Sequence, residues 1–314
     1  MTDFLVKLQN LDRRIIYLVI GVILIVGIYL GKPEKQENIK APTQKLFDAV
    51  NAAPAGPTDH KLILVGITFA ANTMAENANQ ARALIRHLIL AHKRFAIIAV
   101  SEPQGAENGK RFVQDIADQY GCVYGTDWID FGYTIGTIAF FKSFIRDIPG
   151  TVKMDALNHQ PLTSYPIMQG IKTVSNNIAL HVEITASTSL FDWIQFVQTS
   201  TEPRLKLGYA CTGVMASEAA PLLDAGQIEG VMPGLKGAAD YEQLVDNLEA
   251  TELAAGHIRK AYDWKSTPRL DVMPSPARRY MFTQSAAHVA IILFIVLGNL
   301  GMLLARRRSG KEKV

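Results

Sequence analysis

Two apolar segments at opposite ends of the chain constrain its fold more than any other feature. Residues 15–30 (IIYLVIGVILIVGIYL) are uncharged, and residues 286–305 (AAHVAIILFIVLGNLGMLLA) carry only His288 and Asn299 as strongly polar side chains. A helix that crosses a bilayer needs roughly 20 mostly apolar residues. The second segment meets that length, and interfacial side chains next to the first can lengthen it. We therefore predict two transmembrane helices, with the lipid bilayer as a partner.

Basic residues next to these segments predict the orientation of the chain. Arg13 and Arg14 precede the first segment, and Arg306–Arg308 follow the second. Because cytoplasmic flanks carry an excess of Lys and Arg, we expect residues 1–14 and 306–314 to be cytoplasmic tails at the cell membrane. The intervening residues would then be extracytoplasmic. The alternative for the first segment is a cleaved signal peptide, but no small-x-small cleavage pattern follows Leu30.

The sequence between the two segments predicts an α/β region of about 200 residues, either one large domain or two small lobes. Residues 31–59 form a polar stalk with a short helix around 46–52, residues 60–250 alternate between strand and helix patterns, and residues 251–285 form a polar return stalk. Such alternation is typical of a mostly parallel, Rossmann-like sheet with helices on both faces. We predict strands at 61–69, 94–101, 122–125, 136–141, 178–185, 205–211 and 228–232. Helices are predicted after the first strand (with a Thr73–Glu76 capping box) and at 109–120, 162–174, 190–198, 217–225 and 238–248.

The carboxyl ends of the predicted strands are rich in hydroxyl residues and glycine. Ligands of open parallel sheets bind at these ends. The candidate ligand-binding residues are Thr68, Ser101, Thr212, Gly234, Lys236 and Gly237. The competing interpretation is that hydroxyl residues at these positions only cap the helices that follow.

The segment Gly234-Leu-Lys236-Gly237 is the most specific of these candidates. It leaves a strand and opens a helix, where free N–H groups attract anions and glycine permits close approach. It matches neither the P-loop nor the dinucleotide-binding fingerprint. A tight turn with a solvated lysine is the alternative.

Other chemistry has little support in the sequence. The net charge of +3 is spread along the chain, so nucleic-acid binding is not indicated. His181 alternates inside a strand and is expected to be packed or hydrogen-bonded. Cys122 and Cys211 are either a disulfide or two buried thiols. No metal-ligand spacing, cofactor motif or nucleophile elbow is present, and we expect no catalytic residues, metal or cofactor.

The second apolar segment carries a candidate surface for helix association. Small residues and one amide recur along it, at Ala286, Ala290, Gly298, Asn299 and Gly301. Small residues let helices approach closely, and an asparagine in a membrane seeks a partner. The alternative is an asparagine with its amide among the headgroups.

Several segments resemble a family of two-pass membrane proteins of bacteria and archaea whose function is uncharacterised. They are Tyr165–Ile171 (YPIMQGI), Val231–Val245 (VMPGLKGAADYEQLV), Leu297–Leu300 (LGNL) and Leu46–Val50 (LFDAV). The resemblance implies the order span, α/β domain, span, and it transfers no catalytic residues.

Two functions agree with these features. The first is a non-enzymatic structural or scaffold subunit that self-associates or joins partner membrane proteins. The second is a membrane-tethered domain, with or without hydrolase activity, that binds a small anionic ligand at the strand ends. A scaffold should expose an apolar surface, whereas a ligand site should direct Lys236 into a polar pocket.

Overall fold

We analysed a computed structural model that describes residues 13–30, 33–258 and 276–311. The chain divides into two compact units, residues 35–277 and the remaining terminal segments. Each unit is described by itself below. The tail residues 1–12 and residues 259–275 of the predicted return stalk lie outside the described residues.

The domain is built on six parallel strands in the order β3-β2-β1-β4-β5-β6. The strands are β1 (Leu62–Thr68), β2 (Phe95–Val100), β3 (Trp128–Thr134), β4 (Ile178–Thr185), β5 (Leu207–Cys211) and β6 (Gly230–Pro233). β1, β2 and β5 are buried at every position, because helices cover both faces of the sheet. The predicted Rossmann-like parallel α/β architecture is confirmed.

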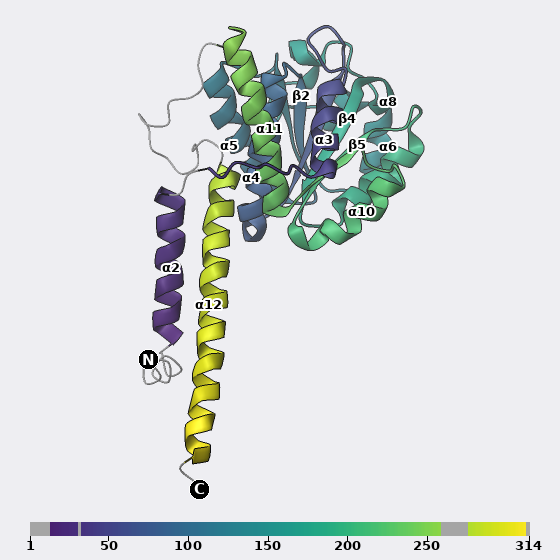
Figure 1. Ribbon diagram of the computed structural model, residues 1–314. Helices are drawn as coiled ribbons and strands as arrows, with labels where there is room; N and C mark the ends of the chain where they lie inside the picture. The colour runs from purple at the N-terminus through teal and green to yellow at the C-terminus, as the bar shows by residue number, and fades with distance from the viewer. Residues whose placement is uncertain (1–12, 31–32, 259–275, 312–314) are drawn as a thin grey trace. The chain divides into compact units, whose positions relative to one another are not determined.

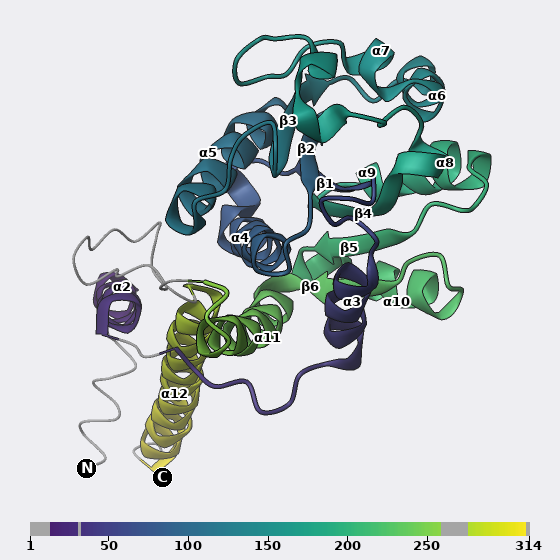
Figure 2. The ribbon, with the colours of Figure 1, turned by 90° about the horizontal axis from the view of Figure 1, so that it is seen from above.

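Figure 2 shows α4, α5 and α11 on one side of the sheet and α6, α8 and α10 on the other. The helices of the domain are α3 (Ala41–Ala52), α4 (Met74–Leu90), α5 (Pro103–Tyr120), α6 (Ile138–Arg146), α7 (Ile148–Val152), α8 (Val174–Asn177), α9 (Ser189–Asp192), α10 (Ala216–Asp224) and α11 (Gly234–Ala254). A π-helical turn, Trp193–Val197, continues α9. The side of the sheet covered by α6, α9 and α10 is called face A below.

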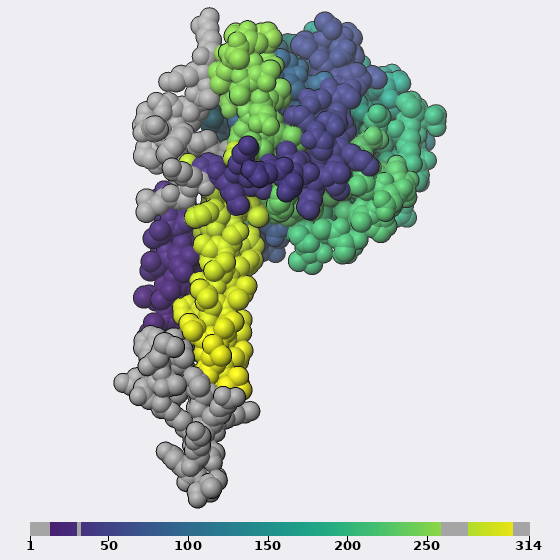
Figure 3. All heavy atoms as spheres, viewed as in Figure 1, coloured from purple at the N-terminus to yellow at the C-terminus, as the bar shows by residue number. Residues whose placement is uncertain are grey.

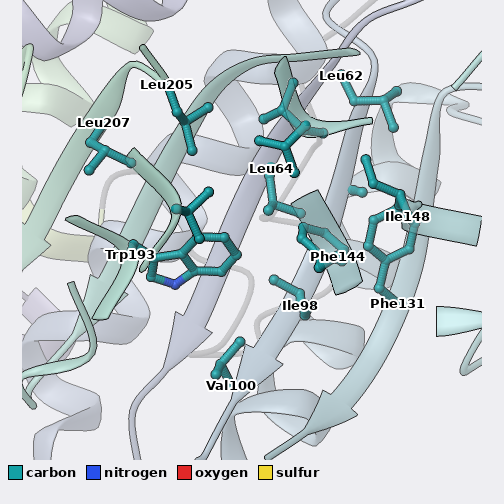
Figure 4. Packing of buried hydrophobic residues seen from close by; sticks show 14 of the residues in the cluster. Leu62, Leu64, Ile98, Val100, Phe131, Phe144, Ile148, Trp193, Leu205 and Leu207 are labelled. Carbon is teal, nitrogen blue, oxygen red and sulfur yellow. The ribbon is translucent and has the colours of Figure 1, made fainter. Parts of the chain in front are cut away.

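Face A holds a large apolar core rich in aromatic side chains (Figure 4). Trp193 lies edge-on to both Phe141 and Phe144, with ring centroids 5.3 and 6.1 Å apart. Leu64 and Ile98 contribute to the same core from β1 and β2. These side chains are almost fully buried, and burying a side chain of this size stabilises the fold by about 1.5–3 kcal/mol.

Two segments of the α/β domain differ in secondary structure from the sequence-based prediction. The third strand is Trp128–Thr134 rather than 122–125 and 136–141, and α6 occupies most of the latter range. Residues 162–174 form two 3₁₀ turns, Leu162–Ser164 and Pro166–Met168, rather than one helix. Pro166 disfavours helix at the preceding residue, and Gly170 has a φ of 79° that ends any helical path.

Helices α3, α4 and α11 meet at one buried histidine. His87 on α4 faces the hydroxyl of Tyr241 (Nδ1 to Oη, 2.7 Å) and the amide oxygen of Asn51 (Nε2 to Oδ1, 3.0 Å). Phe47 stacks on its ring with centroids 4.0 Å apart. Burial lowers the pKa of His87 to about 3. The imidazole is therefore neutral in the folded domain at physiological pH.

Side chains of α11 bind the backbone of the segments at both ends of the domain. The N–H of Gln36 donates to Gln243 Oε1 (3.3 Å), and that of Lys40 donates to Asp240 Oδ2 (3.3 Å). From the other end, Ala277 N–H donates to Glu242 Oε1 (3.1 Å). Figure 3 shows the segment before α3, in dark purple, crossing the surface beside α11.

The terminal unit consists of two antiparallel helices, α2 (Arg13–Leu30) and α12 (Pro276–Lys311, of which Arg278 onward belongs to this unit). A Cβ on Gly27 would lie 2.8 Å from Thr283 Oγ1, so the helices touch there without space for a larger residue. Arg278 Nε donates to the carbonyl of Glu34 (2.8 Å). Residues 276–285, predicted as stalk, are helical because Pro276 suits the first turn of a helix.

One helix among the described residues, Pro276–Leu303, is long and apolar enough to cross a membrane by length and composition. The sequence predicted two. α2 has 18 residues, which span about 27 Å at 1.5 Å per residue. This is slightly less than the roughly 30 Å of a bilayer core.

Replacing His87 tests the buried junction through its pH dependence. Its folded pKa lies below the unfolded value of about 6.5. The unfolded chain therefore binds the extra proton, and stability falls as pH drops from about 6.5 towards 3, by up to about 1.4 kcal/mol per pH unit. We expect His87→Gln to flatten this dependence in chemical unfolding experiments between pH 6.5 and 4. The control is His92→Gln, at an exposed side chain in the turn just after the same helix, and it should keep the wild-type slope.

Candidate functional site

The strand order reverses between β1 and β4, which makes their carboxyl ends the expected ligand site of this fold. β1 leads to α4 on one side of the sheet, and β4 leads to α9 on face A. Thr68 of β1 pairs in register with Thr185 of β4, and Gly66 pairs with Glu183 one step deeper. Side chains two residues apart share a face, so these four positions all project onto face A.

A buried carboxylate lies at the centre of this region. Glu183 and His181 are both fully buried, and His181 Nε2 lies 3.0 Å from Glu183 Oε2. Ser189, at the start of α9, donates its hydroxyl to Glu183 Oε1 at 2.6 Å. A buried carboxylate is tolerated only when it has such partners. The serine contacts the carboxylate and not the histidine, so this is not the order of a serine-hydrolase triad.

Gly66 provides the space that the carboxylate occupies. A Cβ built on Gly66 would lie 1.7 Å from Glu183 Oε2 and 3.0 Å from His181 Cε1. No side chain fits there unless Glu183 moves. The glycine in the middle of a buried strand is therefore explained by the side chain of the neighbouring strand rather than by a turn.

Three polar atoms around this cluster are buried without a hydrogen-bond partner. They are His181 Nδ1, Trp193 Nε1 and Thr68 Oγ1. The Trp193 and His181 rings lie 4.0 Å apart, so the indole covers the imidazole without bonding to it. Each such atom carries an unmet desolvation cost of about 1–3 kcal/mol. Unpaired polar atoms beside a switch point are typical of a polar binding site.

Polar residues of α4 hold together the carboxyl ends of three strands. Gln80 Nε2 donates to the carbonyls of Cys211, Met232 and Gly234 (2.8–3.3 Å). Asn77 Nδ2 donates to the carbonyl of Thr185 at 3.3 Å. These contacts close the ends of β4, β5 and β6 on the α4 side.

The capping box predicted at the start of α4 is not formed. The hydroxyl of Thr73 accepts no cap hydrogen bond. Glu76 Oε2 instead accepts the backbone N–H of Gly213 after β5, at 2.7 Å. A contact across 137 residues therefore replaces the local one.

The loop Gly234–Gly237 has the predicted backbone, but its lysine does not point where an anion-binding residue was predicted to point. Gly234 has a φ of 58°, as a tight turn of this kind requires. Gly237 lies against β6, since its Cβ would come within 2.5 Å of Pro233 Cδ. Lys236 Nζ bonds to Asp240 one turn along α11 and to Gln36 Oε1 (2.8 Å). Its charge is thus directed along the helix and not at the free N–H groups of the loop.

The remaining candidates are spread along the strand ends. Thr212 is buried where β5 ends. Ser101 ends β2 with a φ of 62°, and its hydroxyl accepts the N–H of Gly136 at 2.9 Å. Only Thr68 shares face A with Glu183. Glu183 was not among the predicted residues, although a charge alternating with a histidine in an otherwise apolar strand is a usable signal.

Negative charge gathers near the strand ends. Burial, with a contribution from Glu183, raises the pKa of Asp192. Burial also raises the pKa of Tyr209 beyond its usual range, and Glu218 and Glu183 add to this effect. With Lys236 paired to Asp240, this electrostatic environment disfavours an anionic ligand.

No metal or disulfide is indicated within the described residues. No group of three or more His, Cys, Asp or Glu side chains there could hold a metal ion. Cys122 and Cys211 are unpaired thiols, and burial raises their pKa values to about 11 and about 12.

The helix-association residues divide between two faces of α12. Gly301 is buried and shares the face of Thr283, while Ala286, Ala290 and Gly298 are half-buried. Asn299 is exposed.

Comparisons of the chain with protein-family models, with curated proteins and with solved structures found no match. The resemblance drawn from the sequence therefore stays a prediction.

A double-mutant cycle tests the packing of Gly66 against Glu183. We expect Gly66→Ala to destabilise the protein by about 2–4 kcal/mol, because the new methyl group and the carboxylate cannot both fit. In a Glu183→Ala background the same substitution should cost much less, giving a coupling energy above about 1 kcal/mol in chemical unfolding. Additive effects would show that the two side chains do not compete for one space.

Proposed function

We propose that this protein is a membrane-anchored structural subunit of a homo-oligomeric or multi-protein membrane assembly. The observation that carries the proposal is an apolar surface at the end of the edge strand β3. Tyr133, Ile135 and Ile138 are 45%, 64% and 52% exposed and lie within six residues of one another. Neighbouring exposed apolar side chains of this size are typical of a protein–protein contact.

The arrangement of Lys236 supports this function over anion binding. The cation predicted to hold the anion is already engaged, because the ammonium of Lys236 is bound to Asp240 and Gln36. The second candidate function is binding of a small polar ligand at the switch point. The buried Thr68 hydroxyl and the Glu183 cluster favour it, and the ligand would then be neutral or cationic.

We propose further that α2 and α12 both cross the membrane, with both termini cytoplasmic and the domain outside. Their antiparallel pairing supports this topology, because Gly27 meets Thr283 and Glu34 meets Arg278. If two helices paired in this way cross a bilayer, the start of α2 and the end of α12 lie on the same side of it. The arginines beyond both segments favour the cytoplasm for that side.

Charges placed in the apolar surface should weaken assembly without unfolding the domain. We expect Ile135→Asp combined with Ile138→Asp to reduce the oligomer mass measured by light scattering in detergent. The matched control is Val123→Asp, at a side chain 58% exposed in the loop between α5 and β3. An unchanged mass for the double variant, with an unchanged melting temperature, would contradict the role of this surface.

Cysteine labelling tests the topology. Glu107 is exposed on α5. We expect Glu107→Cys, in a chain carrying Cys122→Ala and Cys211→Ala, to react with a membrane-impermeant maleimide in intact cells. Reaction only after lysis would place the domain in the cytoplasm.

A further inference from the structure

α12 has two different faces along its membrane segment. One carries Thr283, Ala287 and Gly301, which are buried, and it includes the contact of Thr283 with Gly27 of α2. The other face carries His288, Ile292, Ile295 and Asn299, all exposed. At 100° per residue these two faces lie about 140° apart around the helix. Because Thr283 faces Gly27 of α2, which lies beside α12 in Figure 1, the opposite face of the helix is directed away from α2.

The exposed face has the spacing of a helix–helix seam. Steps of four, three and four residues join His288, Ile292, Ile295 and Asn299. Two helices with apolar residues at this heptad spacing pack with a left-handed twist. Ile292 and Ile295 are 58% and 57% exposed and form the apolar part of the seam.

The amide of Asn299 identifies the occupant of the seam. An amide that faces hydrocarbon loses its hydrogen bonds with water, and a partner helix restores them. In a second copy of the chain, inserted in the same orientation, Asn299 lies at the same depth. An asparagine both donates and accepts, so two identical amides satisfy each other across a twofold axis.

We propose that this protein dimerises in the membrane through the seam His288, Ile292, Ile295 and Asn299 of α12, with the two Asn299 amides bonded to each other. The proposal rests on the assembly function proposed above and names its partner, a second copy of the chain. The small residues Ala290 and Gly301, which the sequence placed in the same contact, lie instead towards the α2 side of the helix.

Disulfide cross-linking in native membranes tests the seam. In the full chain carrying Cys122→Ala and Cys211→Ala, we expect Ile295→Cys to give a band of twice the mass when oxidised with copper phenanthroline. Leu293→Cys is the matched control, because it is 55% exposed at nearly the same depth but off the seam. Equal cross-linking at both positions would overturn the seam.

Substitutions that remove or keep the side-chain amide test the role of Asn299 in dimerisation. We expect Asn299→Leu to weaken dimerisation about five-fold, which corresponds to about 1 kcal/mol, and Asn299→Gln to weaken it less. An oligomer that forms without cross-linking at Ile295→Cys overturns the seam and leaves the assembly function standing. A strict monomer in membranes overturns both.

Discussion

The polar side chains of α11 hold both ends of the domain in place, and the helix layer on that side of the sheet depends on them. Asp240, Glu242 and Gln243 are buried, and they accept backbone N–H groups from residues 36, 40 and 277. A buried carboxylate without partners would cost several kcal/mol. The backbone N–H groups and the ammonium of Lys236 offset that cost for Asp240 and Glu242. The same helix packs against α4 and α3 around His87, and it therefore links both ends of the domain to its core.

This arrangement explains why Lys236 is a poor predictor of an anion site. The sequence shows a lysine in a glycine-rich turn, where the local signals of an anion site are present. Asp240 lies one turn further on, and an ion pair at this spacing competes for the same ammonium. The backbone of the loop was predictable, since a positive φ needs glycine. The direction of the lysine was not, because it depends on Gln36, 200 residues away in the sequence.

The elements that could be predicted are those whose pattern is local. β1 and β4 are short apolar or alternating runs bounded by polar residues, and both lie within a residue of the predicted position. β3 was missed because Asp130 and Gly132 interrupt its apolar residues. Both residues are explained by a local turn in the backbone and not by the alternation of a strand. Gly132 has a φ of 75° and binds Asp130 Oδ1 through its N–H. Leu162, Ile167 and Ile171 are buried, but an irregular loop rather than the predicted helix places them there.

Glu183 shows the same limit in the functional site. Its charge in a buried strand is visible in the sequence, but the space for it comes from Gly66 and its hydrogen bond comes from Ser189. Neither residue is marked by a motif, because a glycine in a strand and a serine before a helix each have an ordinary local explanation. Only strand register places Gly66 opposite Glu183, and register is a property of the whole sheet.

In the proposed membrane dimer, the two faces of α12 make two different kinds of contact. Small residues permit close packing within one chain, as Gly27 and Thr283 do, and they need no polar chemistry. A polar residue on the opposite face costs free energy in lipid unless another molecule pairs with it. The sequence does not separate these two roles, since the buried Ala287 and the exposed His288 are adjacent. Helical geometry separates them, because each residue turns the helix by 100° and the two contacts lie on different sides.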